Sequence, residues 1–255
     1  AGYQAAFLCP TELLAKQHCQ LFKKILGDTN CKIELLSSKI KNSEQSNIRT
    51  LLSENKIDII IGTHSLFQEK TLFKNLGLII IDEQHKFGVQ QRIDLSLKGN
   101  VNTDVLLMTA TPIPRTLILT TYGDMDISTI DEKPFNNTNI STLSKSGEKI
   151  DDVLTFLNKR LDDNDQVYWV TPLIEESEKL KLTAAVKRFE YLKKKLNVEV
   201  GLIHGSMKSD EKDKVMEDFI KGITKVIVST TVIEVGIDNQ NANTMIIENC
   251  ERFGL

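Results

Sequence analysis

The sequence has no long hydrophobic run, few cysteines and no excess of basic charge. Its longest apolar runs are about five residues, whereas a membrane-spanning helix needs about 20. No segment has the charged, apolar and small-residue regions of a signal peptide. The four cysteines show neither metal nor disulfide spacing, which is typical of proteins in a reducing cytosol: Cys9, Cys19, Cys31 and Cys250. We therefore expect a cytoplasmic location.

The net charge of −3 and the pI of about 5.9 also exclude bulk electrostatic attraction to nucleic acid. Free-standing nucleic-acid binders often carry a basic face and a high pI. Any contact with DNA must therefore come from a local site.

Short apolar runs alternate with amphipathic helical patterns, which predicts parallel sheets with crossover helices. The expected strands are Gln4–Cys9, Lys32–Leu36, Ile57–Ile61, Leu76–Ile81, Asp104–Met108, Gln166–Val170, Val198–Ile203, Lys225–Ser229 and Thr244–Ile247. Helices are expected at Thr11–Leu26 and Glu44–Ser53, and a third amphipathic stripe begins at Ile150.

A polar stretch at residues 133–139 interrupts this pattern and is the best linker candidate. The chain is therefore predicted to hold two α/β domains in tandem, residues 1–136 and 137–255. It starts within a buried strand pattern and stops without a terminating tail, so we expect both domains to be truncated. We also expect an exposed strand edge near Tyr3.

The most informative stretch is the apolar run Leu78–Ile81, which ends in Asp82, Glu83, Gln84 and His85. Ligands of parallel sheets bind at the carboxyl ends of the strands. Two acids at such an end suit phosphoryl chemistry, in which one holds Mg²⁺ and the other positions the attacking water. A strand that runs into a charged turn is the simpler alternative.

Other strand ends carry hydroxyl, glycine or histidine residues that can contact phosphates or cap helices. They are Pro10-Thr11-Glu12, Gly62-Thr63-His64, Thr109-Ala110-Thr111, His204-Gly205-Ser206 and Thr230-Thr231, the last followed by Gly236 and Asp238. Taken singly, most of these sets also fit a plain capping or structural role.

In this order the set resembles superfamily 2 helicases, and within them the RecG family of branched-DNA helicases. Motif Ia is similar to Pro10–Ala15, motif Ic to Gly62–His64 and motif II to Asp82–His85. Motif III is similar to Thr109–Thr111, the motif IV region to Gln166–Val170 with Pro172–Glu178, and motif V to Thr230–Asp238.

The resemblance implies two RecA-like domains that use ATP and Mg²⁺ to move along double-stranded or branched DNA in recombination and repair. It implies that Asp82 holds Mg²⁺, that Glu83 orients the hydrolytic water, and that Gln84 and His85 sense the nucleotide. Thr109, Ala110 and Thr111 would couple this signal to the second domain, where Gly236 and Asp238 would approach the nucleotide. The implied DNA contacts are Pro10, Thr11, Gly62, Thr63, His64, Thr230 and Thr231.

Two family motifs are absent from the 255 residues. No Gly-x-Gly-Lys-Thr phosphate loop occurs, and motif VI with its arginine finger does not occur either. In the family the loop precedes the equivalent of Ala1 by about one helix. Because that loop holds the nucleotide phosphates and an arginine finger contributes about 10³–10⁵ in rate, we expect the isolated chain not to hydrolyse ATP.

Smaller departures concern contact and hinge sites. The family's Leu-Thr-Gly-Ser reads Leu35-Leu36-Ser37-Ser38, and its Asp-Val-Pro after motif V reads Asp238-Asn239-Gln240. Three interpretations therefore stay open at this point. The chain is the central part of a helicase completed by N- and C-terminal segments in cis, an inactive relic or binding module of the same fold, or one chain of a split helicase completed in trans.

Overall fold

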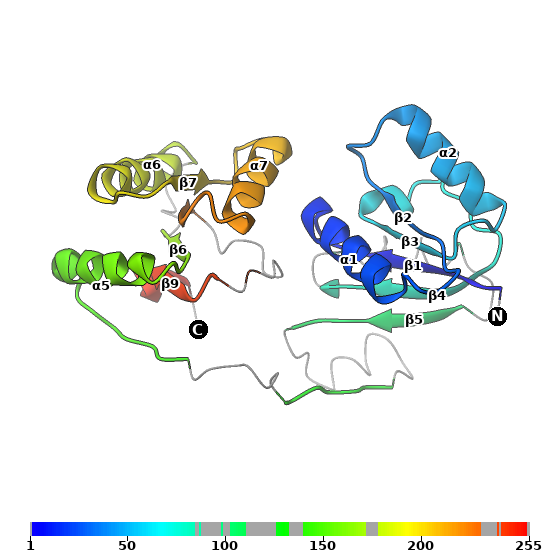
Figure 1. Cartoon of the computed structure of the whole chain (residues 1–255), viewed down its shortest axis with the longest axis horizontal. Helices are drawn as coiled ribbons and strands as arrows, with labels where there is room; N and C mark the ends of the chain where they lie inside the picture. The colour runs from blue at the N-terminus through cyan, green and yellow to red at the C-terminus, as the bar shows by residue number, and fades with distance from the viewer. Residues whose placement is uncertain are drawn as a thin grey trace. The chain divides into compact units, whose positions relative to one another are not determined.

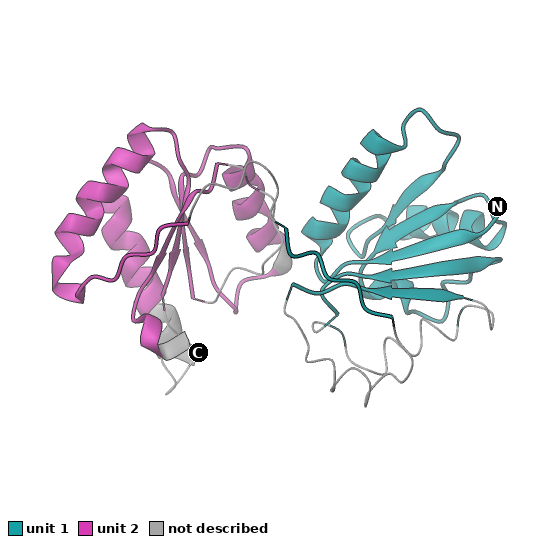
Figure 2. Cartoon of the chain, turned by 90° about the horizontal axis from the view of Figure 1, so that it is seen from below, with its two compact units in different colours: residues 1–132 teal, residues 133–255 magenta. Residues whose placement is uncertain are grey.

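All the strand pairs that the structure describes are parallel, as the alternation of strands and helices predicts. The computed structural model describes residues 2–84, 87, 98, 103–110, 126–132, 140–171, 178–230, 239 and 241–253. The chain divides into the units Ala1–Glu132 and Lys133–Leu255, coloured separately in Figure 2. The predicted boundary at 136/137 falls within 133–139, outside the described residues.

Unit 1 is built on a five-stranded sheet of order β2-β3-β1-β4-β5 (Figure 1). Its strands are β1 (Gln4–Leu8), β2 (Ile33–Leu36), β3 (Ile59–Gly62), β4 (Leu76–Ile81) and β5 (Asp104–Leu107). Its helices are α1 (Glu12–Ile25), α2 (Asn42–Ser53) and the 3₁₀ turn η1 (His64–Leu66). The predicted strands and helices are confirmed, with ends that differ by one or two residues.

The alternation of side chains along β1 explains how helices cover both faces of this sheet. Phe7 and Cys9 face the cluster formed with α1, which contributes Leu14, Ala15 and Cys19. Ala6 and Leu8 face the opposite cluster, to which α2 contributes Ile48 and Leu52. A strand buried on both faces reads as a continuous apolar run, as this one does.

Unit 2 repeats the arrangement on a four-stranded sheet of order β7-β8-β6-β9. Its strands are β6 (Val167–Val170), β7 (Val200–Ile203), β8 (Val226–Ser229) and β9 (Thr244–Ile247). Its helices are α5 (Ile150–Asp162), α6 (Glu178–Lys195) and α7 (Ser209–Ile220), and its 3₁₀ turns are η3 (Gly147–Lys149) and η4 (Cys250–Phe253). Trp169 packs in the cluster shared with α5 and α6. Tyr168 faces α7, where its ring lies 4.9 Å from that of Phe219, and burial raises the pKa of Tyr168 to about 12.

The expected open strand edge near Tyr3 is wrong. β1 pairs with β3 on one side and with β4 on the other, so it is an inner strand. Tyr3 lies beside Gly77, where a Cβ atom would approach the Tyr3 side chain to 2.8 Å. Within the described residues the outer strands are β2 and β5.

A buried glutamine amide ties the amino edge of each sheet to the helix behind it. Gln4 Nε2 donates to the carbonyls of Leu52 (2.8 Å) and Ile57 (3.0 Å), while its Oε1 accepts from the amides of Lys74 and Asn75. Gln4 is 1% exposed, so these partners replace water completely.

Gln166 makes the equivalent contacts in unit 2. Its Nε2 donates to the carbonyls of Phe219 and Thr224, and its Oε1 accepts from Asn239 Nδ2 at 3.2 Å. Leu52 and Phe219 are each the penultimate residue of a helix, and Ile57 and Thr224 each lie two residues before a strand. The two units therefore use the same internal device.

We predict that Gln4→Ala lowers the free energy of unfolding by about 3 kcal/mol, because each buried group left unpaired costs about 1–3 kcal/mol. Gln4→Met, which keeps the length of the side chain but loses the hydrogen bonds, should be nearly as destabilising. Urea denaturation followed by circular dichroism measures both changes.

The matched control is Gln20→Ala on the exposed side of α1, which should change stability by less than about 0.5 kcal/mol. Gln4→Met at wild-type stability would contradict the role given to the amide.

Candidate functional site at the carboxyl edge of the sheets

The strands of unit 1 end in register, which brings five loops together at one edge. Gly62 pairs with both Leu36 and Leu8, Leu8 pairs with Ile81, and Ile81 pairs with Leu107. The loops that follow these five residues contain the predicted site residues of unit 1. Leu8 and Ile81, which are 73 residues apart in the sequence, thus lie side by side, as the parallel topology requires.

Asp82 follows β4 directly, and it contacts β1 through its backbone and α1 through its side chain. Its backbone N–H donates to the Leu8 carbonyl at 2.9 Å, which continues the β1–β4 pairing. Its Oδ2 lies 3.4 Å from Nε2 of His18 on α1, and the Asp82 side chain is 19% exposed. The pKa of the neighbouring Cys9 thiol is raised, first by burial and then by the negative charge of Asp82.

Glu83 and Gln84 connect the end of β4 to the end of β5. Glu83 has a positive φ of 48°, a conformation that is uncommon for a residue other than glycine. Glu83 Oε2 accepts from the Ala110 amide at 3.4 Å, and the Gln84 amide donates to the Met108 carbonyl at 3.1 Å. The predicted motif II and motif III residues are therefore in direct contact.

Glu12 forms a hydrogen-bonded centre that joins three of the loops. Its carboxylate accepts from the Ser37 hydroxyl, from the amide and hydroxyl of Ser38 at 3.0 Å each, and from the Thr63 hydroxyl at 3.5 Å. These donors follow β2 and β3, while Glu12 starts the helix after β1. One carboxylate thus fixes the relative positions of the loops after β1, β2 and β3.

Ser37 stands where the family pattern has glycine, and the structure gives this departure a physical role. Its side chain is 3% exposed, and its hydroxyl is used as a donor to Glu12. Serine in place of the family's glycine is therefore compatible with the hydrogen bonds that connect these loops.

Pro10, Thr11, Gly62, Thr63 and His64 all lie on this edge. Thr11 caps α1, since its hydroxyl accepts from the Leu14 amide at 3.3 Å. At Gly62 a Cβ atom would come within 2.6 Å of the Leu36 carbonyl oxygen, so the neighbouring strand is sufficient to require glycine. The exposed His64 packs its ring 5.8 Å from that of Phe87 and 6.0 Å from that of Phe67.

Unit 2 has a corresponding edge. Val170 pairs with Ser229 and Ile247, and Ser229 pairs with Ile203, so these strands also end in register. Thr230 follows β8, is 3% exposed and donates its amide to the Ile203 carbonyl at 3.3 Å. Thr230 therefore lies at the carboxyl edge of this sheet as a buried residue, and its contact with DNA stays a prediction.

Five predicted site residues lie outside the described residues: His85, Thr111, Thr231, Gly236 and Asp238. Among the described ones, Asp82, Glu83, Gln84, Thr109 and Ala110 share the β4–β5 end of the edge, and Pro10, Thr11, Gly62, Thr63 and His64 follow β1 and β3. The structure thus brings the described candidates of unit 1 to one edge.

The sequence does not predict His18 as a site residue, nor the hydrogen-bond partners of Glu12. His18 carries no motif signal of its own, although its position four residues after Leu14 places it on the sheet-facing side of α1. Glu12 was placed within motif Ia, but its three loop partners are 25, 26 and 51 residues away. Contacts of that sequence separation leave no local pattern.

The Asp82 environment fits the ion that the family implies. Mg²⁺ prefers oxygen ligands and is usually held by one or two carboxylates together with substrate phosphates. No group of three or more metal-ligating side chains occurs among the described residues. A single aspartate at a strand end suits Mg²⁺ bound together with a nucleotide.

Two family profiles match consecutive parts of the chain. The DEAD/DEAH box helicase family matches residues 1–119, and the helicase conserved C-terminal domain matches residues 148–253. Both parallel-sheet units are thus RecA-like helicase domains.

Curated relatives decide the family. The ATP-dependent DNA helicase RecG of Streptococcus pneumoniae is 48% identical over 257 residues, which cover all of this chain and 38% of that protein. The RecG of Thermotoga maritima is 46% identical and is covered to 33%. The chain belongs to the RecG helicase family. It spans about a third of the length of these RecG relatives.

Solved structures agree. A structure of RecG bound to a three-way DNA junction superposes with a TM-score of 0.79 at 41% identity, covering all of this chain and 33% of that one. The Saccharomyces cerevisiae protein Dbp5, at 22% identity and a TM-score of 0.67, shares the fold and is covered to 61%. No helix in the described part of the chain is both long and apolar enough to cross a membrane.

We predict that Glu12→Ala loosens the loops after β2 and β3, because four donor groups on three residues lose their common acceptor. Hydrogen exchange should show faster exchange of the Ser38 amide by about tenfold, the factor that corresponds to about 1.4 kcal/mol of lost hydrogen bonding. Glu12→Gln keeps one acceptor oxygen and should show a smaller change.

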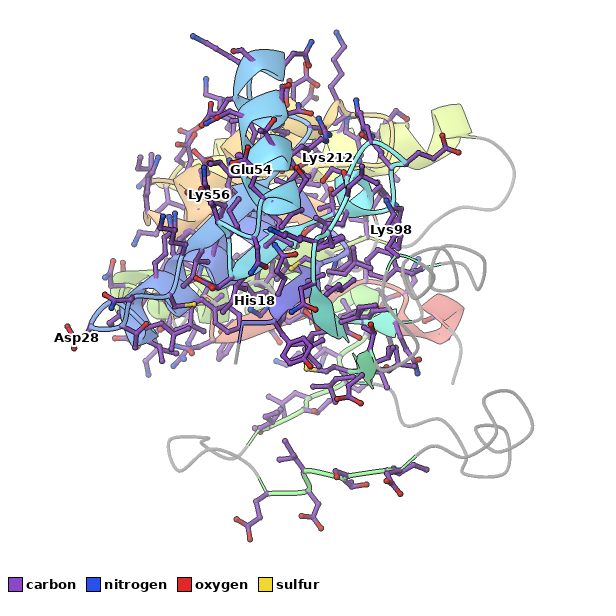
Figure 3. The ribbon with its side chains drawn as sticks, turned by 90° about the vertical axis from the view of Figure 1, so that its right-hand side faces the viewer. His18, Asp28, Glu54, Lys56, Lys98 and Lys212 are labelled. Carbon is purple, nitrogen blue, oxygen red and sulfur yellow. The ribbon has the colours of Figure 1, made fainter. Side chains whose placement is uncertain are left out.

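The control is Glu54→Ala in the turn after α2, whose carboxylate pairs only with the exposed Lys56 in the contacts described (Figure 3). Unchanged protection of Ser38 in Glu12→Ala would show that the carboxylate does not organise the edge.

Proposed function

We propose that residues 1–255 form the motor segment of an ATP-dependent DNA helicase that remodels branched DNA in recombination and repair. The observation that carries the proposal is the row of strand ends in unit 1, where Asp82, Glu83 and Gln84 lie beside Ala110. The names of the RecG relatives and of the junction-bound structure give the proposal its substrate class.

On the nucleotide side, Asp82 would hold Mg²⁺, which supplies charge stabilisation at the phosphates when bound. Glu83 would orient the attacking water, and Gln84 and His85 would respond to the state of the nucleotide. The hydrogen bond from the Ala110 amide to Glu83 supports a coupling role for Thr109, Ala110 and Thr111, since a movement of that carboxylate acts directly on the loop after β5.

Gly236 and Asp238 would approach the nucleotide from unit 2, as the family resemblance implies. The cytoplasm is the proposed location, in keeping with four cysteines that are free thiols in the structure.

On the DNA side, Pro10, Thr11, Gly62, Thr63, His64, Thr230 and Thr231 would lie along the backbone. The start of α1 offers backbone N–H groups to a phosphate. The Glu12 charge is spread over four hydrogen bonds, which reduces its repulsion of DNA. Because the net charge of −3 gives no bulk attraction to DNA, contact must come through such local groups.

A polypeptide of residues 1–255 alone is predicted not to hydrolyse ATP, because it contains no Gly-x-Gly-Lys-Thr loop to hold the phosphates. DNA-stimulated ATPase should appear when the segments that flank the matched region in the Thermotoga maritima relative are added as separate chains. Asp82→Ala and Glu83→Gln should abolish this activity, whereas Glu54→Gln should not change it.

Hydrolysis by residues 1–255 alone would overturn the predicted inactivity. If no mixture of the folded polypeptides shows ATPase activity, that result would contradict a working site and favour a binding module of the same fold.

A further inference from the structure

His18 holds a position that none of the recognised motifs explains. It lies near the middle of α1 (His18 is labelled in Figure 3). Its Nε2 is 3.4 Å from Asp82 Oδ2. The side chains of His18 and Asp82 are 27% and 19% exposed, so the contact sits at the boundary between the core and the edge.

The imidazole is fixed by the sheet below it. Its ring lies 4.7 Å from the ring of Phe7 at an angle of 39°, and Phe7 is 5% exposed on β1. Phe22, one turn further along α1, packs edge-on against Phe7 with ring centroids 5.4 Å apart. Nε2 of His18 is therefore presented to Asp82 by a rigid aromatic support.

Asp82 is fixed at its backbone by the hydrogen bond to Leu8 and at its carboxylate by His18. Within the described part of the chain, no hydrogen bond or ion pair involves its second oxygen, Oδ1. A partly exposed contact of this kind contributes only about 0–1 kcal/mol to stability. The contact between His18 and Asp82 thus adds little to stability. Its main effect is to orient the Asp82 carboxylate.

We propose that His18 is a positioning residue that sets the orientation of the Asp82 carboxylate and leaves Oδ1 available for the divalent cation. The inference rests on the proposed function, in which Asp82 holds that cation. Groups that hydrogen-bond to a metal-ligating carboxylate orient it, and their loss typically weakens metal binding by about 10–100-fold.

The test separates binding of the metal from binding of the nucleotide, in the natural polypeptide that carries residues 1–255. Mn²⁺ serves as the probe, and electron paramagnetic resonance measures the free ion in the presence of ADP. A fluorescent ADP analogue in EDTA measures metal-free nucleotide binding. The variants are His18→Ala, His18→Gln, Asp82→Ala and the control Gln20→Ala on the exposed side of the same helix.

We expect His18→Ala to raise the apparent Kd for Mn²⁺ about tenfold and to leave metal-free ADP binding unchanged. His18→Gln should restore most of the affinity, because its Nε2 can reach Asp82 as the imidazole Nε2 does. Gln20→Ala should match the wild type, and Asp82→Ala should lose Mn²⁺ binding.

Equal Mn²⁺ affinity in His18→Ala and wild type overturns the inference and leaves the proposed function intact. An equal loss of metal and metal-free nucleotide binding, or no rescue by His18→Gln, also overturns it, since both indicate a general structural role. A wild-type protein that binds no Mn²⁺ with ADP, or an Asp82→Ala variant that still does, overturns the proposed function and this inference with it.

Discussion

The parallel register of β1 with its two neighbours is the constraint on which the site depends. Leu8 pairs with both Gly62 and Ile81, so the loops after three strands emerge at one edge. A shift of one residue would turn the apolar side chains of β1 to the wrong faces. The buried clusters that select this register therefore also determine that Asp82 lies beside Cys9 and within reach of His18. Packing and site geometry are consequences of the same pairing.

The buried glutamines show that this register is secured from the opposite edge as well. Gln4 and Gln166 each bind the end of one helix and the start of the next strand, at equivalent positions of the two units. A buried polar group that is fully satisfied specifies one arrangement, because alternatives leave it unpaired. In each unit the buried glutamine thus fixes the amino edge of the sheet, whereas the carboxyl edge carries loops of varied sequence. Loops at the carboxyl edge can therefore vary without disturbing the strand pairing.

How far the sequence predicts this site depends on the range of the contacts. The bounds of β4 and β9 agree with their apolar runs, and Asp82 lies at the strand end where the pattern placed it. The position of β1 inside its sheet was mispredicted, because strand order arises from pairing with residues more than 50 positions away. His18 and the partners of Glu12 were missed for the same reason. Family motifs identify which loops matter, and only the fold shows how these loops hold one another.

The central proposal is that the carboxyl edge of unit 1 contacts DNA. Its most direct test is photo-crosslinking of a radiolabelled three-way DNA junction to a photoreactive phenylalanine placed at His64 on this edge, or at the exposed Lys74 on the opposite edge. The account predicts a crosslink from position 64 that unlabelled junction competes away, and little or none from position 74. Equal crosslinking from both positions, or crosslinking from position 74 alone, would contradict it.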